Sequence, residues 1–187
     1  QVMTVEEILQ RARTSILIGE HEQAEKLLNR LLRDDPDCMP AMLLLGALYE
    51  KTGRYEEAES RLHTALKLDP ANGEIHNNLG VVYKNTGRYQ QAIKVLNRAL
   101  QLLKDRADVH YNLGNVYKEI QSRSKAIDHY HRALKLDPNF IPVYTNLGTV
   151  YEQLGKPEEA AKIYERGLEI DPNNPKLRYN MGNIQKA

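Results

Sequence analysis

The sequence predicts an all-α protein built from tandem two-helix units, and three features of the 187-residue chain support this. A Leu-Gly or Met-Gly pair recurs at intervals of thirty-four residues, a Tyr follows three residues after four of the five glycines, and an Ala follows nine residues after each Tyr. Such a period is typical of repeat proteins, whose units bury their apolar faces against one another. The pairs are Leu45-Gly46, Leu79-Gly80, Leu113-Gly114, Leu147-Gly148 and Met181-Gly182.

The ends of the expected helices repeat with the same period. Glycines at 19, 53, 87 and 155 fall where the first helix of a unit should end in a left-handed residue. Asp-Pro pairs at 35–36, 69–70, 137–138 and 171–172 fall where the second helix should stop. We therefore expect two helices in each of the units 5–38, 39–72, 73–106, 107–140 and 141–174, then one further helix over 175–187, and no sheet.

Each first helix carries an apolar stripe for packing. At 100° per residue, Val109, Leu113 and Val116 share one face, and the same positions are apolar in the neighbouring units. The small residues of the period allow the two helices of a unit to approach closely, and the recurring Tyr fills the space beside them. A single unit cannot bury this surface, so we expect the units to stack.

The order Leu-Gly, Tyr, turn Gly, small Ala and closing Pro resembles the tetratricopeptide repeat. The resemblance covers nearly the whole chain, with 5–38 as a degenerate repeat and 175–187 as the first helix of a further or capping unit. It implies one array over 5–174, folded as a right-handed α-solenoid whose first helices line a concave groove. It also implies a module that binds other proteins and has no catalytic activity.

The chain departs from this pattern at a few places. Arg11-Ala12 replaces the Leu-Gly pair of the first unit, Gln121 replaces a turn Gly, and Gly167 replaces a second Ala. Lys104 stands where the third unit should close with Pro. Because Lys does not break a helix as Pro does, we expect a more continuous helix at this boundary.

Composition excludes several classes of function. Lys and Arg number 26 against 25 Asp and Glu, a net charge of +1, so no overall field would draw the chain to nucleic acid or to an anionic membrane. The longest strongly apolar stretch, 41–49, is too short to span a bilayer. Cys38 is the only cysteine, which rules out an internal disulfide and fits a reducing compartment, so we expect a cytoplasmic protein. We expect no cofactor and no metal site, because His129 and His131 point in different directions on a helix.

The most specific functional signal is a row of asparagines. Asn78, Asn112, Asn146 and Asn180 hold the same position in successive first helices, opposite the packing stripe. A carboxamide offers donors and an acceptor, so such a row can bind the backbone of an extended peptide without reading its side chains. The row is similar to the asparagine ladder of O-GlcNAc transferases. The alternative is that the four asparagines reflect only the shared ancestry of the repeats.

Other positions on the same face complete the candidate groove. The second, fifth, ninth and twelfth residues of the first helices share that face with the asparagines. The candidate peptide-binding residues are Asn77, Asn78, Val81, Lys84, Tyr111, Asn112, Asn115, Lys118, Thr145, Asn146, Thr149, Lys176, Tyr179, Asn180 and Asn183.

Two neighbouring features leave alternatives open. The N-terminal part of the groove is apolar at Leu43 and Leu44, which predicts either a second pocket or a surface covered by the degenerate first repeat. Asn115, Asn146 and Lys176 match part of the carboxylate clamp of co-chaperones. Two further cations of that clamp are missing, so its electrostatic attraction for a carboxylate would be weak.

The sequence thus predicts a scaffold that binds an extended peptide, or a helix, of a partner protein in its groove. One alternative is the substrate-recognition arm of a larger enzyme such as a glycosyltransferase. Another is a self-assembling scaffold. Leu177, Met181 and Ile184 repeat the packing stripe with no partner helix following in the sequence, so we expect self-association through this C-terminal edge and a longer parent protein.

Overall fold

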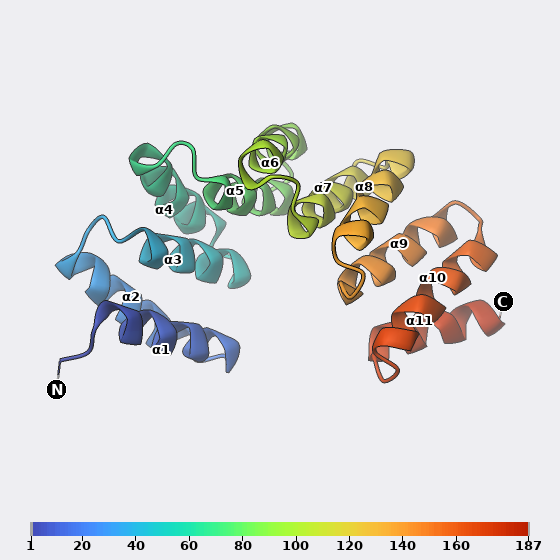
Figure 1. Cartoon of the computed structure of the whole chain (residues 1–187), viewed down its shortest axis with the longest axis horizontal. Coiled ribbons are helices and arrows are strands. Elements are labelled where there is room, and N and C mark those ends of the chain that lie inside the picture. Colours follow the sequence, from blue (N-terminus) through green and yellow to red (C-terminus); the bar gives the residue numbers. More distant parts are fainter. Residues whose placement is uncertain (1, 187) are drawn as a thin grey trace. The chain divides into compact units, whose positions relative to one another are not determined.

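The computed structural model describes residues 2–186, and this part of the chain forms eleven α-helices joined by short turns (Figure 1). No strand occurs among these residues. The helix count and the all-α class predicted from the thirty-four-residue period are confirmed. The chain divides into two compact units, unit 1 (residues 1–103) and unit 2 (residues 104–187).

Unit 1 consists of three helical hairpins in sequence order. They are α1 (Val5–Leu17) with α2 (His21–Asp34), α3 (Met39–Lys51) with α4 (Tyr55–Leu68), and α5 (Gly73–Asn85) with α6 (Tyr89–Leu103). Each second helix packs on the next first helix, α2 on α3 and α4 on α5. The first helices also contact one another, α1 with α3 and α3 with α5, so they form one continuous layer of the unit.

Unit 2 consists of two hairpins and a closing helix. They are α7 (Ala107–Glu119) with α8 (Arg123–Leu136), α9 (Ile141–Gln153) with α10 (Pro157–Ile170), and α11 (Pro175–Lys186). The first helices again lie side by side, because α9 contacts both α7 and α11. Leu177 of α11 is fully buried, whereas Met181 and Ile184 are half-buried against the core of this unit.

The turns within hairpins behave as the glycine positions predict. The φ angles at glycines 19, 53, 87 and 155 are +84°, +75°, +74° and +69°, the left-handed region that a residue without Cβ adopts without strain. Gln121 makes the same turn with a φ of 59°. Replacement of the turn glycine therefore preserves the hairpin at a conformational cost of about 1 kcal/mol.

The expectation of a more continuous helix at Lys104 is wrong. Helix α6 ends at Leu103, Lys104 and Asp105 take φ angles of 54° and 68°, and α7 begins at Ala107. The break is stabilised by side chains: His110 Nε2 donates to Asp105 Oδ1 at 2.5 Å, and Arg106 pairs with Asp108. These contacts join residues of the break to the first turns of α7, and α6 ends here without a Pro.

In every hairpin after the first, the two helices approach closely at the recurring glycine. A Cβ on Gly80 would lie 2.4 Å from Leu96, and one on Gly114 would lie 2.5 Å from the Tyr130 ring. The second-helix residue facing the glycine is a leucine in the last two hairpins of unit 1 and a tyrosine in both hairpins of unit 2. These residues are Leu62, Leu96, Tyr130 and Tyr164. The tyrosines fill the same space as the leucines and add a hydroxyl.

Candidate functional site

An open pocket of about 280 Å³ on unit 2 is lined by α7 and by residues at the starts of α9 and α11. Its lining combines aromatic and apolar surface with a few polar groups and one cation. The lining residues are Tyr111, Ile141, Pro142, Thr145, Asn146, Asn174, Pro175 and Lys176. The Tyr111 ring also packs against Phe140, with ring centroids 5.0 Å apart. Four candidate residues from the sequence therefore surround one pocket: Tyr111, Thr145, Asn146 and Lys176.

A hydrogen-bond network joins three helices beside this pocket. The Tyr130 hydroxyl of α8 donates to Asn115 Oδ1 of α7 at 2.7 Å. Asn146 Nδ2 of α9 donates to the same Asn115 Oδ1 at 2.8 Å and to the Tyr111 hydroxyl at 3.3 Å. Tyr130 is fully buried, and burial raises the pKa of its phenol far above the usual range. The hydroxyl therefore keeps its proton and acts as a permanent donor.

The next hairpin repeats this device with different partners. The Tyr164 hydroxyl of α10 donates to Glu152 Oε2 at 2.9 Å and lies 3.5 Å from Thr149 Oγ1. Burial is the main cause that raises the pKa of Tyr164 to about 12. Thr149 Oγ1 in turn donates to the Thr145 carbonyl at 2.9 Å. In both hairpins of unit 2, a second-helix tyrosine thus contacts polar groups of the first helices.

The remaining candidate residues differ in exposure. Asn115 and Thr145 are buried, whereas Asn112, Lys118, Thr149 and Asn180 of unit 2 are half-buried. Tyr179 is 69% exposed, and Asn183 is exposed beside it on α11. In unit 1 the structure places Asn77 in the core at 5% exposure, with Asn78, Val81 and Lys84 half-buried. The candidate residues therefore range from exposed to buried, and the buried ones also pack in the core.

Sequence reasoning missed Tyr130 and Tyr164, because they belong to second helices and the candidate groove was confined to first helices. The available signal was the change from Leu96 to Tyr130 at equivalent positions, accompanied by the change from Val81 to Asn115 on the facing helix. The hydroxyl of Tyr130 and the carboxamide of Asn115 occur together because they form a hydrogen bond inside the hairpin, and buried polar groups need such a partner.

The sequence left open whether the apolar part of the predicted groove, in unit 1, is a second pocket or a surface covered by the first repeat. Leu43 and Leu44 are half-buried, and their helix α3 contacts α1 and α2 of the first hairpin. Close by, Asn85 Nδ2 donates to Glu50 Oε1 at 2.7 Å. Burial raises the pKa of Glu50, and Lys84 opposes that rise. This polar contact lies at the C-terminal ends of α3 and α5.

Charged pairs in unit 1 lie at the junctions between hairpins. Arg54 NH1 contacts Glu25 Oε2 at 2.7 Å, and the Arg54 guanidinium lies 4.3 Å from the centroid of Tyr49.

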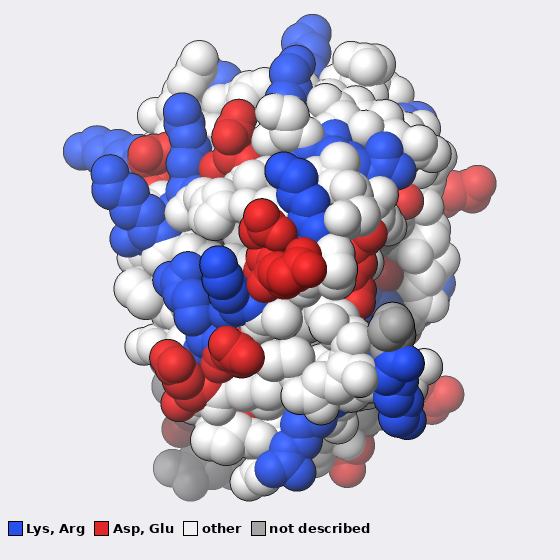
Figure 2. Space-filling model, turned by 90° about the vertical axis from the view of Figure 1, so that its right-hand side faces the viewer, with Lys and Arg blue, Asp and Glu red and all other residues white. Residues whose placement is uncertain are grey.

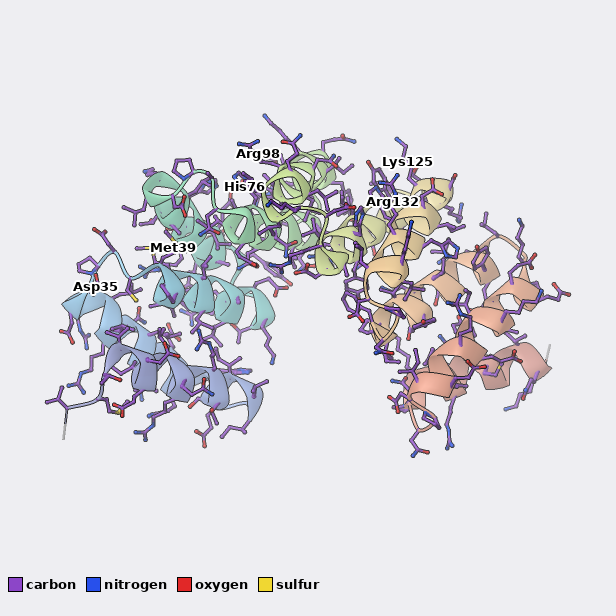
Figure 3. The ribbon with its side chains drawn as sticks, in the orientation of Figure 1. Asp35, Met39, His76, Arg98, Lys125 and Arg132 are labelled. Atoms are coloured by element: carbon purple, nitrogen blue, oxygen red, sulfur yellow. The ribbon has the colours of Figure 1, made fainter. Side chains whose placement is uncertain are left out.

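Figure 2 shows one face of the molecule, on which acidic and basic side chains alternate rather than gather by sign. Figure 3 labels Lys125 and Arg132 on α8, the helix that also carries Tyr130. Lys125 Nζ lies 5.3 Å from the centroid of the Tyr117 ring.

Two kinds of feature are absent from the part of the chain that the structure describes. Residues 2–186 contain no group of three or more His, Cys, Asp or Glu side chains arranged to hold a metal ion. No helix within these residues combines the length and the apolar character needed to cross a lipid bilayer.

Comparison with known proteins identifies the family. Profiles described as tetratricopeptide repeat match residues 18–61, 51–114, 107–140 and 141–174. Together with the helical hairpins, these matches show that the chain belongs to the tetratricopeptide repeat family, and its fold class is the all-α solenoid of tandem repeats. No curated protein sequence matches the chain.

Several solved structures are similar over most of the chain. A crystal structure of MamA is 28% identical with a TM-score of 0.70, covering 92% of this chain and 97% of MamA. The protein TTC0263 of Thermus thermophilus is 23% identical with a TM-score of 0.86, covering 97% and 99%, and supports the fold alone. The Cut9–Hcn1 structure is 26% identical with a TM-score of 0.85, and the match covers 95% of this chain but 35% of that one.

Proposed function

We propose that the chain is a non-catalytic interaction scaffold that holds an extended segment of another protein against the pocket of unit 2. The tetratricopeptide repeat fold supports a protein-interaction scaffold in general. The observation that carries the specific proposal is the gathering of Tyr111, Thr145, Asn146 and Lys176 around one open pocket. These residues come from three different helices, and they include both hydrogen-bonding groups and an aromatic ring.

The chemistry of the pocket defines the segment it would hold. Tyr111, Pro142 and Pro175 offer rigid apolar surface for a side chain of the ligand. Lys176 is exposed at the rim, and no Asp or Glu lines the pocket. We therefore expect a peptide with an apolar residue for the pocket and an acidic residue beside it.

The test begins with peptide selection on the intact chain. Dodecamers from a random phage-displayed library are selected on the immobilised protein, synthesised, and measured by calorimetry. On binding, the backbone amide signals of Tyr111, Thr145, Asn146 and Lys176 should shift in the nitrogen–proton NMR spectrum. Selection of no peptide, or shifts confined to other helices, would refute the proposal.

A pair of charge reversals sharpens the test. Lys176→Glu should weaken binding of an acidic selected peptide by about five-fold or more, since an attraction becomes a repulsion. Lys162→Glu is the matched control, because Lys162 is exposed on α10 and does not line the pocket. Equal loss in both variants would indicate an effect of overall charge and contradict a contact at Lys176.

A further inference from the structure

The carboxamides of Asn115 and Asn146 are held in one orientation. Asn115 Oδ1 accepts from both Tyr130 and Asn146, and Asn146 Nδ2 is the donor of its two hydrogen bonds. The network thus takes up the oxygen of one carboxamide and the nitrogen of the other. These three hydrogen bonds use neither Asn115 Nδ2, on a residue that is 9% exposed, nor Asn146 Oδ1, on a half-buried residue.

The Tyr130 hydroxyl is the group that fixes this orientation. It is buried and carries a single proton, which it donates to Asn115 Oδ1 at 2.7 Å. If Asn115 turned over, its Nδ2 would face the donor Nδ2 of Asn146, and the shared acceptor would be lost. The Tyr130 ring cannot move aside, because it packs directly over Gly114, where even a Cβ would lie within 2.5 Å.

We propose that Tyr130 is a positioning residue that makes this part of the groove present a hydrogen-bond donor at Asn115 and an acceptor at Asn146, so that it binds the backbone of an extended peptide. This inference rests on the proposed function and specifies which ligand conformation the groove recognises. In an extended chain, the N–H and C=O of one residue point to the same side, as in a hydrogen-bonded pair of antiparallel strands. Asn115 and Asn146 are themselves in direct contact, which matches the close spacing of these two backbone groups.

A helical ligand does not fit this arrangement. In a helix the interior N–H and C=O groups already bond to one another along the helix axis, so they are not offered together at the side. An extended segment also turns alternate side chains to opposite faces, which allows a neighbouring apolar side chain to enter the pocket beside Tyr111. The geometry therefore selects the extended peptide from the two ligands that the sequence left open.

Unit 1 provides an internal comparison. At the positions of Tyr130 and Asn115, its third hairpin carries Leu96 and Val81, and Leu96 fills the space against Gly80. That hairpin has the same backbone arrangement without the hydroxyl or the carboxamide. Packing alone therefore does not require Tyr at this position.

The test uses Tyr130→Phe in the full chain, with the dodecamers selected on the parent protein as the probe. The variant removes one hydroxyl and keeps the ring over Gly114. Affinity should fall about three- to thirty-fold, because the two carboxamides are no longer held in the binding orientation. Tyr151→Phe is the matched control: its hydroxyl also contacts a side chain, His131 at 3.2 Å, but lies outside the network and the pocket. It should bind with unchanged affinity.

Methylation of the peptide backbone distinguishes a positioning role of Tyr130 from a purely structural role. Each N–H of the best peptide is methylated in turn, and one position should weaken binding to the parent at least ten-fold. That penalty should be clearly smaller in Tyr130→Phe, because Asn146 no longer presents a fixed acceptor. A merely structural role would lower the melting temperature and leave the methylation profile unchanged.

The outcomes distinguish the two proposals. Peptides that bind at the pocket with the same affinity and the same methylation profile in parent and variant would overturn the role of Tyr130 and leave the proposed function standing. A selected peptide that is helical when bound would overturn the backbone readout. Absence of any selected peptide, or binding elsewhere on the chain, would overturn both.

Discussion

Arg88 and Glu59 form a two-pronged ion pair that links the second and third hairpins of unit 1. Arg88 NH1 lies 3.0 Å from Glu59 Oε1 and NH2 lies 2.6 Å from Oε2, while the guanidinium sits 4.6 Å from the Tyr83 ring centroid. Arg54 and Glu25 repeat this arrangement one hairpin earlier. The equivalent positions in the following repeat are Ser122 and Ile93, so the device does not continue in the sequence.

Arg88→Ala should lower the free energy of unfolding by about 1 kcal/mol, because a two-pronged pair stacked on an aromatic ring exceeds an ordinary surface pair. Arg98→Ala on α6 (Figure 3) is the matched control, since exposed Arg98 contacts only Gln101 in the described part of the chain, and it should change stability little. Urea unfolding measures both. Arg88 lowers the pKa of Glu59, so the contribution of the pair is present above pH 4.5 and is lost as pH falls through the folded-state pKa. Equal losses in the free energy of unfolding for Arg88→Ala and Arg98→Ala would contradict a stabilising ion pair between Arg88 and Glu59.

Gly148→Ala should destabilise the chain by about 1–3 kcal/mol, because its Cβ would lie 2.1 Å from the Tyr164 ring in a fully packed hairpin. Gly182→Ala tests the same repeat position in α11, where a Cβ would meet nothing within 4 Å. There the better helix propensity of Ala should raise stability by about 0.5–1 kcal/mol. Thermal unfolding followed by circular dichroism compares the two, and similar melting temperatures would show that the close approach at Gly148 is not required.

His129 should make unit 2 sensitive to mild acid. Its ring stacks on Tyr117 at 5.4 Å, and its Nδ1 lies 2.9 Å from His110 Nδ1. Burial first, then the charges of His110 and Arg132, lower its pKa from 6.5 to about 4, while Asp128 and Asp105 act in the opposite direction. Between those values the unfolded chain binds a proton that the folded chain does not, so stability should fall as pH drops from 6.5 to 4 and level off below.

The loss should be about 1–2 kcal/mol once solvent screening of this half-buried ring is allowed for. Urea unfolding at several pH values measures the loss, and an NMR titration of the His129 ring measures its pKa. His129→Phe keeps the stacking on Tyr117 and should flatten this part of the pH profile. A folded-state pKa near the ordinary histidine value of 6.5 would contradict the prediction.

Self-association through the C-terminal edge stays a prediction, and the structure narrows the residues that would mediate it. Leu177 is fully buried and cannot contribute, so Met181 and Ile184, both half-buried, are the residues to change. Replacing both with Lys should shift the sedimentation of an associating parent toward the monomer. Leu154→Lys is the control, because Leu154 is 41% exposed and belongs to the end of α9 rather than to α11. Association that survives the double change would exclude this edge as the contact.

The sequence was sufficient for features that depend on one position of the repeat. The left-handed turns at Gly53 and Gly87 and the buried stripe of α7 follow from residue type and spacing alone. The break after α6 could not be predicted in this way. It occurs at Lys104 and Asp105, two non-glycine residues with positive φ, and is accompanied by a contact between Asp105 and His110 that spacing alone does not reveal.

The candidate site was predictable in position but not in its internal chemistry. Helical periodicity placed Tyr111, Asn146 and Lys176 on one face, and the structure brings them to one pocket. The pairing of Asn146 with Asn115 could not be deduced, because it depends on Tyr130 of another helix. The assumption that groove asparagines are free of structural duty fails for Asn146, whose Nδ2 makes two hydrogen bonds within the unit.

The change from Leu96 to Tyr130 at the position facing the recurring glycine has a consequence for how such proteins diversify. Tyr130, the proposed positioning residue, lies on the second helix of its hairpin, where either a leucine or a tyrosine side chain packs against the recurring glycine of the first helix. A scaffold of this kind can acquire a new ligand preference through a substitution at one rear position and a matching change in front, while every backbone turn stays as it was. Evolution of recognition is then uncoupled from evolution of the fold, repeat by repeat.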